Sequence, residues 1–304
     1  MRVDQLAAMR LFVRIVEMGS FGKAARSMSM SSSNATERMA RLEEILGVRL
    51  LARTTRAVAP TEAGTRYYEV CRRVLGELDD IETSLVGSQE MLAGRVRVSA
   101  NVSIARSILV PRLPAWFEQH PGIHVELVMN DQRSDFVHEG IDFAVRIGGL
   151  EDQDLVLRPL GRPRRVTVAS PAYLRKMGTP KSPDDLAKHH LIDFLLPQRG
   201  ARLEWEFDRD GKRQELFPRS VASIGDAEAR LQLAIAGMGI VQSLSFIAAP
   251  ALREGTLKRI LTSWETPAPE VSILYPRDRH LPTRTQATMD AFTAWIKEAI
   301  STAE

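Results

Sequence analysis

The chain has 304 residues, of which 44% are hydrophobic and 26% are charged; this suits two or three globular domains and excludes a chain that is disordered throughout. Its single cysteine, Cys71, excludes an internal disulfide, and because no signal peptide and no run of 18 apolar residues is found, we expect a cytoplasmic protein that does not enter a membrane. The net charge is only +3, but residues 1–66 hold 11 Lys and Arg against 6 Asp and Glu, whereas residues 67–90 hold 2 against 6. The basic surplus at the N-terminal end indicates either an anionic partner, such as nucleic acid or a membrane surface, or charges scattered on a solvated surface.

Three helices are predicted within the first fifty residues. The first has apolar residues at spacings of three and four and ends at Gly19. The second spans residues 21–28 with Ser20 as its N-cap, and the third spans residues 32–46 and ends at Gly47. The apolar face of the first helix consists of Leu6, Met9, Val13 and Val16, with Phe12 beside it.

Two short helices joined by a three-residue turn, residues 29–31, are typical of a helix-turn-helix, because the outer face of the third helix is polar. In such a unit the N-terminal part of the second helix enters the major groove of DNA, and its free N–H groups contact phosphate. A plain three-helix bundle has the same apolar pattern, so the pattern alone leaves both open.

A small β-wing is predicted next. Residues 48–53 and 57–60 read as two short strands around the polar turn Thr54-Thr55-Arg56. Arg53 and Arg56 at this tip could contact phosphate or enter a minor groove. A helix-turn-helix followed by a basic wing is a winged-helix module.

A long helix is predicted from Thr61, its N-cap, to about Gln89. Its apolar residues recur at alternating spacings of four and three, which predicts a seam that pairs with a second copy of the chain. The seam consists of Tyr67, Cys71, Val74, Leu78, Ile81 and Leu85. Cys71 is expected to pack there as a small apolar residue; a redox-sensing thiol is the alternative, and it lacks a partner cysteine.

From Gly94 onward, strands and helices alternate in two sets, as in a parallel α/β sheet. The chain is expected to return to the first set at its end, so two α/β subdomains should form a clamshell that binds a ligand at the carboxyl ends of its strands. The expected strands are residues 95–100, 125–129, 143–147, 166–169, 191–194, 203–207, 240–241 and 271–275. The expected helices are residues 103–119, 134–139, a short one from Ser182, 227–236 and 283–300.

Signatures of catalysis are missing from the sequence. It has no Gly-x-Ser-x-Gly elbow, no P-loop and no His-Glu-x-x-His motif. The sequence Gly237-Met238-Gly239 closes a helix, so it is not a dinucleotide fingerprint, and the adjacent His189 and His190 suit no common metal site. We therefore predict no catalytic residue, no metal and no cofactor, and we expect that the protein is not an enzyme.

Several motifs occur in the same order as in a known family. In the N-terminal part they are Gly19-Ser20-Phe21, Ala24-Ala25, Arg41-Leu42-Glu43-Glu44, Leu46-Gly47-Val48-Arg49-Leu50-Leu51, Arg53-Thr54-Thr55-Arg56 and Thr61-Glu62-Ala63-Gly64. The C-terminal part adds residues 94–100, 144–148, 169–174 and 236–240. On these motifs the chain resembles the LysR-type transcriptional regulators, in the commonest branch of their effector domains, over essentially its full length. It departs from them at Ser32, where Gln is common, at Glu37, where Arg or Lys is common, and at Gln242-Ser243-Leu244, where a Leu-Pro pair is usual.

The resemblance implies an α/β protein with an N-terminal winged helix-turn-helix, a long linker helix and a two-subdomain, periplasmic-binding-protein-like effector domain. The DNA-binding domain would cover residues 1–60, the linker and dimerisation helix residues 61–91, and the effector-binding domain residues 92–304. Within the effector-binding domain, subdomain I would comprise about residues 92–161 and 267–304, and subdomain II about residues 162–266.

The resemblance also implies which residues make contacts. Those expected to bind DNA are Ser20, Ser31, Ser32, Ser33, Thr36, Glu37, Arg38, Arg41, Arg53, Thr54, Thr55 and Arg56. Those expected to bind a small-molecule effector are Ala100, Asn101, Val102, Ser103, Ile147, Gly148, Phe194, Ser223 and Asp226. Glu37 either accepts a hydrogen bond from a cytosine amino group or pairs with Arg41. Asn101 and Ser223 either donate to a small anion or merely cap helices.

The predicted function is that of a sequence-specific transcriptional regulator, which binds a double-stranded DNA operator of roughly two-fold symmetry and responds to a small metabolite. The resemblance implies a homodimer or homotetramer and contact with RNA polymerase. Two alternatives stay open. One is a ligand-binding or enzymatic clamshell with an N-terminal helical interaction module; the other is an architectural DNA-binding protein, which would not need so long a C-terminal region.

Overall fold

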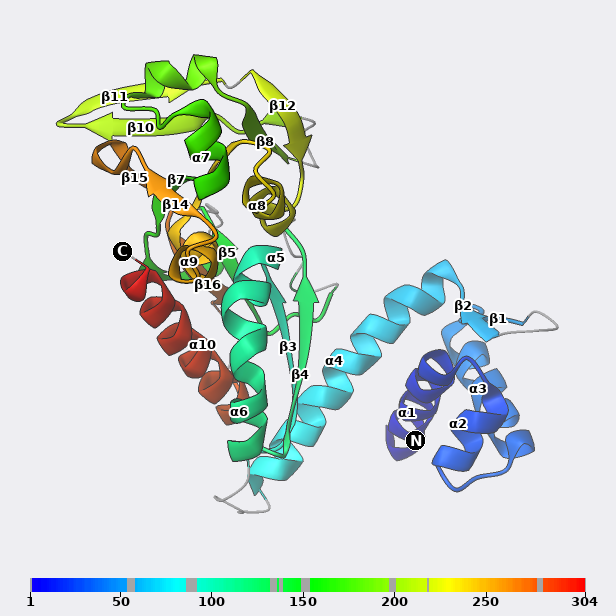
Figure 1. Ribbon diagram of the computed structural model, residues 1–304. Helices are drawn as coiled ribbons and strands as arrows, with labels where there is room; N and C mark the ends of the chain where they lie inside the picture. The colour runs from blue at the N-terminus through cyan, green and yellow to red at the C-terminus, as the bar shows by residue number, and fades with distance from the viewer. Residues whose placement is uncertain are drawn as a thin grey trace. The chain divides into compact units, whose positions relative to one another are not determined.

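The computed structural model describes residues 2–53, 58–85, 92–131, 136, 139–148, 154–196, 201–217, 219–277 and 281–303 (Figure 1). The chain folds as two compact units. The first unit consists of residues 1–95 with residues 122–124 and 134–141, and the second unit consists of the rest of the chain. Within the residues that are described, no helix has both the length and the apolar composition that a membrane span requires.

Three helices open the first unit, and their bounds confirm the prediction to within one residue. They are α1 (Arg2–Met18), α2 (Phe21–Ser27) and α3 (Ser32–Leu46). The side chains of Ser20 and Ser31 accept hydrogen bonds from backbone N–H groups of α2 and α3 and are therefore their N-caps. Gly47 ends α3 with a φ of 66°, a left-handed conformation that favours glycine.

The buried face of α1 agrees only in part with the predicted one, since Met9 and Phe12 are buried as expected. Leu11, Phe12 and Ile15 are fully buried in the core of the first unit, whereas Val13 and Val16 are only partly buried. The buried face is therefore rotated about the helix axis relative to the predicted face, toward Leu11 and Ile15 and away from Val13 and Val16. Both sets of residues have helical spacing, and only the packing of the other helices decides which set is covered.

The wing consists of β1 (Leu51–Arg53) and β2 (Val58–Pro60), which pair antiparallel. Glu43 of α3 ties the wing to the helices, because its Oε1 accepts hydrogen bonds from the backbone N–H groups of Leu50 (2.7 Å) and Leu51 (3.0 Å). The strands confirm the predicted wing, although β1 begins later than expected. The predicted tip, residues 54–57, lies outside the described residues.

The helix α4 (Glu62–Leu85) follows the wing, and the side chain of Thr61 caps it by accepting from the Gly64 N–H (2.9 Å). Gly64 lies against the wing, since a Cβ at this position would be 1.9 Å from the carbonyl oxygen of Leu50. Only glycine therefore fits where α4 leaves the wing.

The second unit is built on two sheets. The five-stranded sheet has the order β4-β3-β5-β16-β6. Its strands are β3 (Gly94–Ala100), β4 (Ile123–Met129), β5 (Phe143–Ile147), β6 (Leu155–Gly161) and β16 (Val271–Pro276). β5 is parallel to β3, but β16 is antiparallel to both β5 and β6, so the prediction of a parallel sheet was wrong and the sheet is mixed. A strand that returns to a sheet from a distant part of the chain can lie parallel or antiparallel to its neighbours.

Helices pack beside this sheet. The segment after β3 is helical but irregular, with α5 (Val102–Ile104), a π-helical turn (Ala105–Leu109), a 3-10 turn (Val110–Arg112) and α6 (Leu113–Gln119). Pro111 and Pro114 lack the N–H that a regular α-helix needs, which accounts for the changes of pitch. The C-terminal helix α10 (Thr283–Thr302) contacts the sheet through Phe292, whose ring centroid lies 5.8 Å from that of Phe143.

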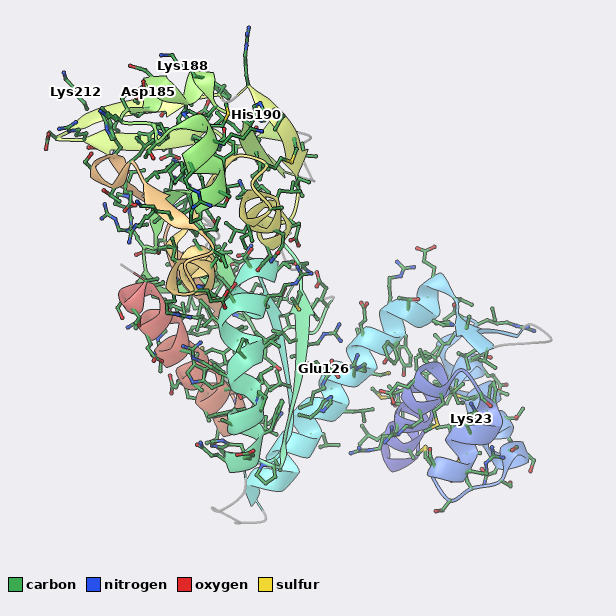
Figure 2. All side chains as sticks on the ribbon, in the orientation of Figure 1. Lys23, Glu126, Asp185, Lys188, His190 and Lys212 are labelled. Carbon is green, nitrogen blue, oxygen red and sulfur yellow. The ribbon has the colours of Figure 1, made fainter. Side chains whose placement is uncertain are left out.

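The seven-stranded sheet has the order β12-β8-β13-β7-β14, with β9 beside β8 and β15 beside β7. Its strands are β7 (Arg164–Ala169), β8 (Leu191–Leu196), β9 (Ala201–Arg202), β12 (Ser220–Ile224), β13 (Ile240–Leu244), β14 (Lys258–Ile260) and β15 (Thr266–Pro267). A separate hairpin consists of β10 (Trp205–Arg209) and β11 (Lys212–Leu216). The helices are α7 (Pro171–Met177), α8 (Ala227–Ile235) and α9 (Ser245–Arg253), with 3-10 turns at Pro183–Lys188 and Thr262–Trp264. Asp185, labelled in Figure 2, caps the first of these turns by accepting from the Ser182 N–H (3.0 Å).

The chain passes between the two sheets twice, after β6 and before β16. The two crossing segments run side by side, since the backbone N–H of Ala268 donates to the carbonyl of Pro163 (2.7 Å). The five-stranded sheet and its helices form the first half of the second unit. The seven-stranded sheet and its helices, residues 164–267, form the second half.

Several elements of the second unit were not predicted, notably β6, β12, β14, α7 and α9. The helix α9 carries Pro250 in its interior, a residue that argues against a helix when only the sequence is known. The predicted helix at residues 134–139 lies largely outside the described residues.

Candidate DNA-binding surface and effector site

One face of α3 is buried and the opposite face is exposed, as predicted. The buried residues are Ala35, Met39 and Leu42. The exposed residues include Ser32, Ser33, Asn34, Glu37 and Arg41. The exposed face contains the first turn of the helix, which is the part of a recognition helix that reaches the bases.

Several hydroxyls predicted to bind DNA already have partners inside the first unit. Ser20 and Ser31 are N-caps, and the Ser31 Oγ lies 3.0 Å from the Ser33 Oγ. Thr36 is half-buried and donates to the carbonyl of Ser32 (2.9 Å). Ser20, Ser31 and Thr36 therefore hold the two helices in shape, while Ser32 and Ser33 lie on the exposed edge.

Basic side chains are found on α3 and on α2. Arg38 donates from its Nε to the Oδ1 of Asn34 (3.1 Å), one turn earlier on α3. Lys23 and Arg26 of α2 are also exposed but were not predicted as contacts (Lys23 is labelled in Figure 2). The first helix of a helix-turn-helix crosses the DNA backbone, so these exposed positions on α2 are further candidates for phosphate contact. Asn34, also not among the predicted contacts, is exposed in the first turn of α3 and is a further candidate.

The wing tip stays a prediction. Arg53 is the last residue of β1, and its side chain lies outside the described residues together with Thr54, Thr55 and Arg56. The described strands β1 and β2 pair antiparallel, Arg53 with Val58.

The predicted seam on α4 is divided between two environments. Cys71 is completely buried and packs with Leu75 in the core of the first unit, where Tyr67 and Val74 are partly buried. Burial raises the pKa of the Cys71 thiol to about 11, which disfavours the thiolate that a redox sensor needs. The expected packing of Cys71 as a small apolar residue is confirmed. Its assignment to a contact between chains is wrong, because a side chain buried inside one chain has no surface to offer another.

Val70, one position earlier, is 44% exposed. The spacing from Tyr67 to Val74 fits a heptad through either Val70 or Cys71, and the sequence does not distinguish them. Leu78 is partly buried, and the side chains of Ile81 and Leu85 lie outside the described residues.

In the second unit, the predicted effector residues that follow β3 and end β5 lie together. The Ile147 N–H donates to Asn101 Oδ1 (2.8 Å), and the Asn101 N–H donates to the carbonyl of Val145 (3.2 Å). Asn101 Nδ2 and the Val102 N–H both donate to Asp131 Oδ1 (2.6 and 3.1 Å). The Asn101 side chain makes no helix cap, so that alternative role was wrong. It joins the ends of two strands to Asp131 instead.

The other residues of this group contribute mainly their backbone. Ala100 is fully buried, and its carbonyl accepts from the Asn130 N–H (3.0 Å). The Gly148 N–H donates to the carbonyl of Glu270 (2.8 Å). Ser103 is partly exposed and is therefore the hydroxyl of this group that a ligand could reach.

The remaining predicted effector residues lie in the second half. Phe194 is a partly exposed residue of β8. Ser223 lies within β12, where its hydroxyl is 3.3 Å from that of Ser220, so it does not cap a helix. Asp226 does, because its Oδ1 accepts from the Ala229 N–H (2.8 Å) at the start of α8.

A buried arginine beside Phe194 was not predicted. Arg230 of α8 is 5% exposed; its guanidinium lies 4.8 Å from the centroid of the Phe194 ring and donates to the carbonyl of Gln242 (3.2 Å). Burial lowers the pKa of Arg230 to about 10, an effect that the carboxylates of Asp193 and Asp226 oppose. At neutral pH a fixed cation therefore lies next to a predicted effector residue.

The two adjacent histidines have structural contacts. The hydroxyl of Tyr173 lies 3.3 Å from His189 Nδ1 and accepts from the His190 N–H (2.8 Å). Across the described part of the chain, no group of three His, Cys, Asp or Glu side chains is arranged to hold a metal ion.

The two units together define a class of protein. A winged helix with an exposed polar recognition helix is a DNA-binding unit, and two α/β halves joined by a double crossing form an architecture suited to small ligands. Such a chain is a ligand-responsive transcriptional regulator.

Family comparison makes this specific. The helix-turn-helix of bacterial regulatory proteins of the lysR family matches residues 6–65, and the LysR substrate binding domain matches residues 89–297. The chain belongs to the LysR family of transcriptional regulators, with a helix-turn-helix DNA-binding domain and an effector-binding domain. These regulators bind DNA and small-molecule effectors.

Individual relatives agree with the family. A protein of Haemophilus influenzae named as an HTH-type transcriptional regulator is 35% identical over 280 residues, which is 92% of this chain and 96% of that protein. An HTH-type transcriptional repressor of Pseudomonas aeruginosa is 32% identical over 97% of this chain and 92% of that protein. Among solved structures, CrgA of Neisseria meningitidis, a LysR-type transcriptional regulator, is 29% identical with a TM-score of 0.61, over 95% of this chain and 98% of that one.

Proposed function

We propose that the α3 helices of two copies read an operator of two-fold symmetry, and that a small metabolite bound by the second unit controls this binding. The observation that carries the proposal is the first turn of α3, where Ser32, Ser33 and Asn34 are exposed while the opposite face is buried. Short polar side chains at this place can exchange hydrogen bonds with base edges in the major groove. The exposed Arg41 would contact phosphate beside them.

Pairing of two chains along α4 gives the protein the two-fold symmetry that such an operator requires. Val70 takes the place of Cys71 in this contact, because Val70 is exposed on α4 and Cys71 is not. Paired helices present two copies of α3 to half-sites about one turn of DNA apart. We extend the proposal to a homotetramer and to contact with RNA polymerase on the basis of family membership.

The protein acts without catalysis in this proposal, as expected of a regulator that binds two ligands of different kinds. It works in the cytoplasm, beside the chromosome that carries its operator. Membership in a family of transcriptional regulators supports both statements.

A nuclease footprint on the DNA upstream of the protein's own gene, at two salt concentrations, tests DNA binding. We expect protection of a dyad-symmetric site that weakens steeply as salt rises, because phosphate contacts release counterions. Arg41→Ala should weaken binding by about tenfold. The control Arg14→Ala removes another exposed arginine, on α1, that pairs with Glu17 (3.3 Å), and it should have no effect. Equal effects of both variants would contradict the role of α3.

Sedimentation tests the pairing of α4. Val70→Asp places a charge in the proposed contact and should convert the oligomer to monomers. The matched control is Val48→Asp, since Val48 is 41% exposed but lies outside α4. An unchanged oligomer for Val70→Asp would remove the α4 contact.

A further inference from the structure

A cluster of charged side chains links the two halves of the second unit. Arg106, in the π-helical turn after α5, has its Nη1 2.9 Å from Asp226 Oδ2 and 3.8 Å from Glu228 Oε2. The neighbouring Ser107 donates to Glu228 Oε1 (3.3 Å). Arg106 and Ser107 belong to the first half, and both carboxylates lie at the start of α8 in the second half; α5 and α8 face each other in Figure 1.

These side-chain contacts add to the covalent connections between the halves. The chain itself connects the halves through the two crossing segments, between which the Ala268 N–H donates to the carbonyl of Pro163. Packing of α9 against α10 also spans the halves. Two adjacent crossings can act as a hinge, because a few residues there absorb a change of angle. The charged cluster resists such a change, since separation of the halves would pull Arg106 away from α8.

The cluster is weak enough to be broken. The Arg106 side chain is about half exposed, at 51%, so water competes with its carboxylate partners and salt screens them. Glu228 Oε2 is buried and accepts no hydrogen bond from the described residues, so Glu228 is only partly satisfied. Asp226 serves two partners at once, the Ala229 N–H and Arg106.

We propose that Arg106, Asp226 and Glu228 form a latch that holds the two halves together when no effector is bound and opens to admit one. For its role in effector control the latch rests on the proposed function. Asp226 is a predicted effector-binding residue whose Oδ2 is bound by Arg106, so an effector that binds this oxygen competes with the latch. The effector then binds the open arrangement better than the latched one, and this difference in affinity is what shifts a two-state equilibrium.

Distances between two spin labels test the latch in the full chain, without effector. Cysteines introduced at Glu118, in the first half, and Gln232, in the second half, are exposed attachment sites. Cys71 can stay, because it is completely buried. Dilution with unlabelled chain removes distances between copies.

Three variants separate the latch from other effects. Arg106→Gln removes the cation. Asp226→Asn removes the charge but keeps an oxygen that can cap α8. The matched control Arg112→Gln breaks an ion pair with Glu298 (3.6 Å) that lies entirely within the first half.

We expect Arg106→Gln and Asp226→Asn each to raise the population of long distances about fivefold, the effect of losing one exposed ion pair, and Arg112→Gln to leave the wild-type distribution. High salt should open the wild-type chain in the same way and leave Arg106→Gln unchanged, because that variant has neither ion pair. Identical distributions for wild type and Arg106→Gln would overturn the latch. The measurement uses neither DNA nor effector, so a missing operator footprint would contradict the proposed function and leave this result as it stands.

Discussion

The interiors of the two units are built from different kinds of residue. The core of the first unit is apolar except for one thiol, Cys71. Among the side chains that the structure describes, the buried polar and charged ones all lie in the second unit, and they include Arg146, Arg165, Asp193 and Arg230. Close apolar packing fixes one arrangement of the helices. A buried charged side chain instead needs an ion-pair or hydrogen-bond partner, and a change of partner can accompany a change of conformation. A DNA-reading unit gains from the first property, and a unit that responds to a ligand gains from the second.

The largest effect should follow removal of a buried charge from the second unit. Arg230→Met leaves the buried carboxylate of Asp193 beside an apolar side chain, so we expect the free energy of unfolding to fall by about 3–5 kcal/mol. The four tryptophans, Trp116, Trp205, Trp264 and Trp295, all lie in the second unit, so their fluorescence reports the unfolding of that unit. Arg253→Met, at an exposed position of α9, is the control and should change little. Equal stability of the two variants would mean that the interior does not depend on its charges.

The next largest effect tests the close packing of the first unit. Gly64→Ala places a Cβ 1.9 Å from the carbonyl oxygen of Leu50. Because that oxygen belongs to the backbone, no change of side-chain rotamer can relieve the clash. We expect a loss of about 3 kcal/mol, seen by circular dichroism as early melting of helix while tryptophan fluorescence is unchanged. Gly76→Ala, in the same helix, meets nothing within 4 Å and should stabilise α4 by up to about 1 kcal/mol. A tolerated Gly64→Ala would show that the first unit is less closely packed than the structure indicates.

A pH dependence of the first unit follows from its single thiol. Burial raises the pKa of Cys71 from an ordinary value of 9.0 to about 11, so the unfolded chain loses this proton at lower pH than the folded chain does. The stabilisation is complete below pH 9 and is lost as pH rises toward 11, by about 2 kcal/mol. The pKa of Tyr67 is raised as well, chiefly by burial, and adds to the loss at still higher pH. Urea unfolding followed by circular dichroism between pH 8 and pH 10 should show a decline that Cys71→Val abolishes; the same decline in the variant would assign it to another group.

The smallest effect concerns the surface and should leave both interiors unchanged. Arg53→Ala removes one phosphate contact of the wing, so we expect weaker binding to all DNA sequences and a salt slope reduced by about 1. Loss of discrimination between sequences at an unchanged slope would contradict a phosphate contact. Melting temperatures of both units serve as the control.

What the sequence revealed about α3 was local. Its start at Ser32 after a three-residue turn, its end at Gly47 and its exposed face follow from turn and cap residues and from a period of 3.6 residues, which need no knowledge of distant segments. The same reasoning failed at Cys71, because one heptad spacing fits two adjacent positions and only packing against α1 decides between them.

The predicted effector site depended on contacts that sequence spacing does not contain. Asn101 meets Asp131, and Arg106 meets Asp226, which lies 120 positions further along the chain. Family resemblance selected Asn101 and Asp226 but gave no account of their partners. The sequence could not predict that β16 is antiparallel to β5 for the same reason: the direction of a strand depends on the path by which the chain returns from the second half.

The burial of Cys71 has a mechanical consequence for α4. The helix is fastened to the DNA-reading unit by Thr61, by the close approach at Gly64 and by the packing of Cys71 and Leu75. Over its 24 residues it extends about 36 Å, so a tilt of about 5° displaces one end by about 3 Å relative to the other. Because these contacts fix its first turns to the DNA-binding unit, α4 is expected to move with that unit as one rigid element. If α3 reads bases as proposed, a small rotation of α4 would move it by about the length of a hydrogen bond, enough to change which base it contacts.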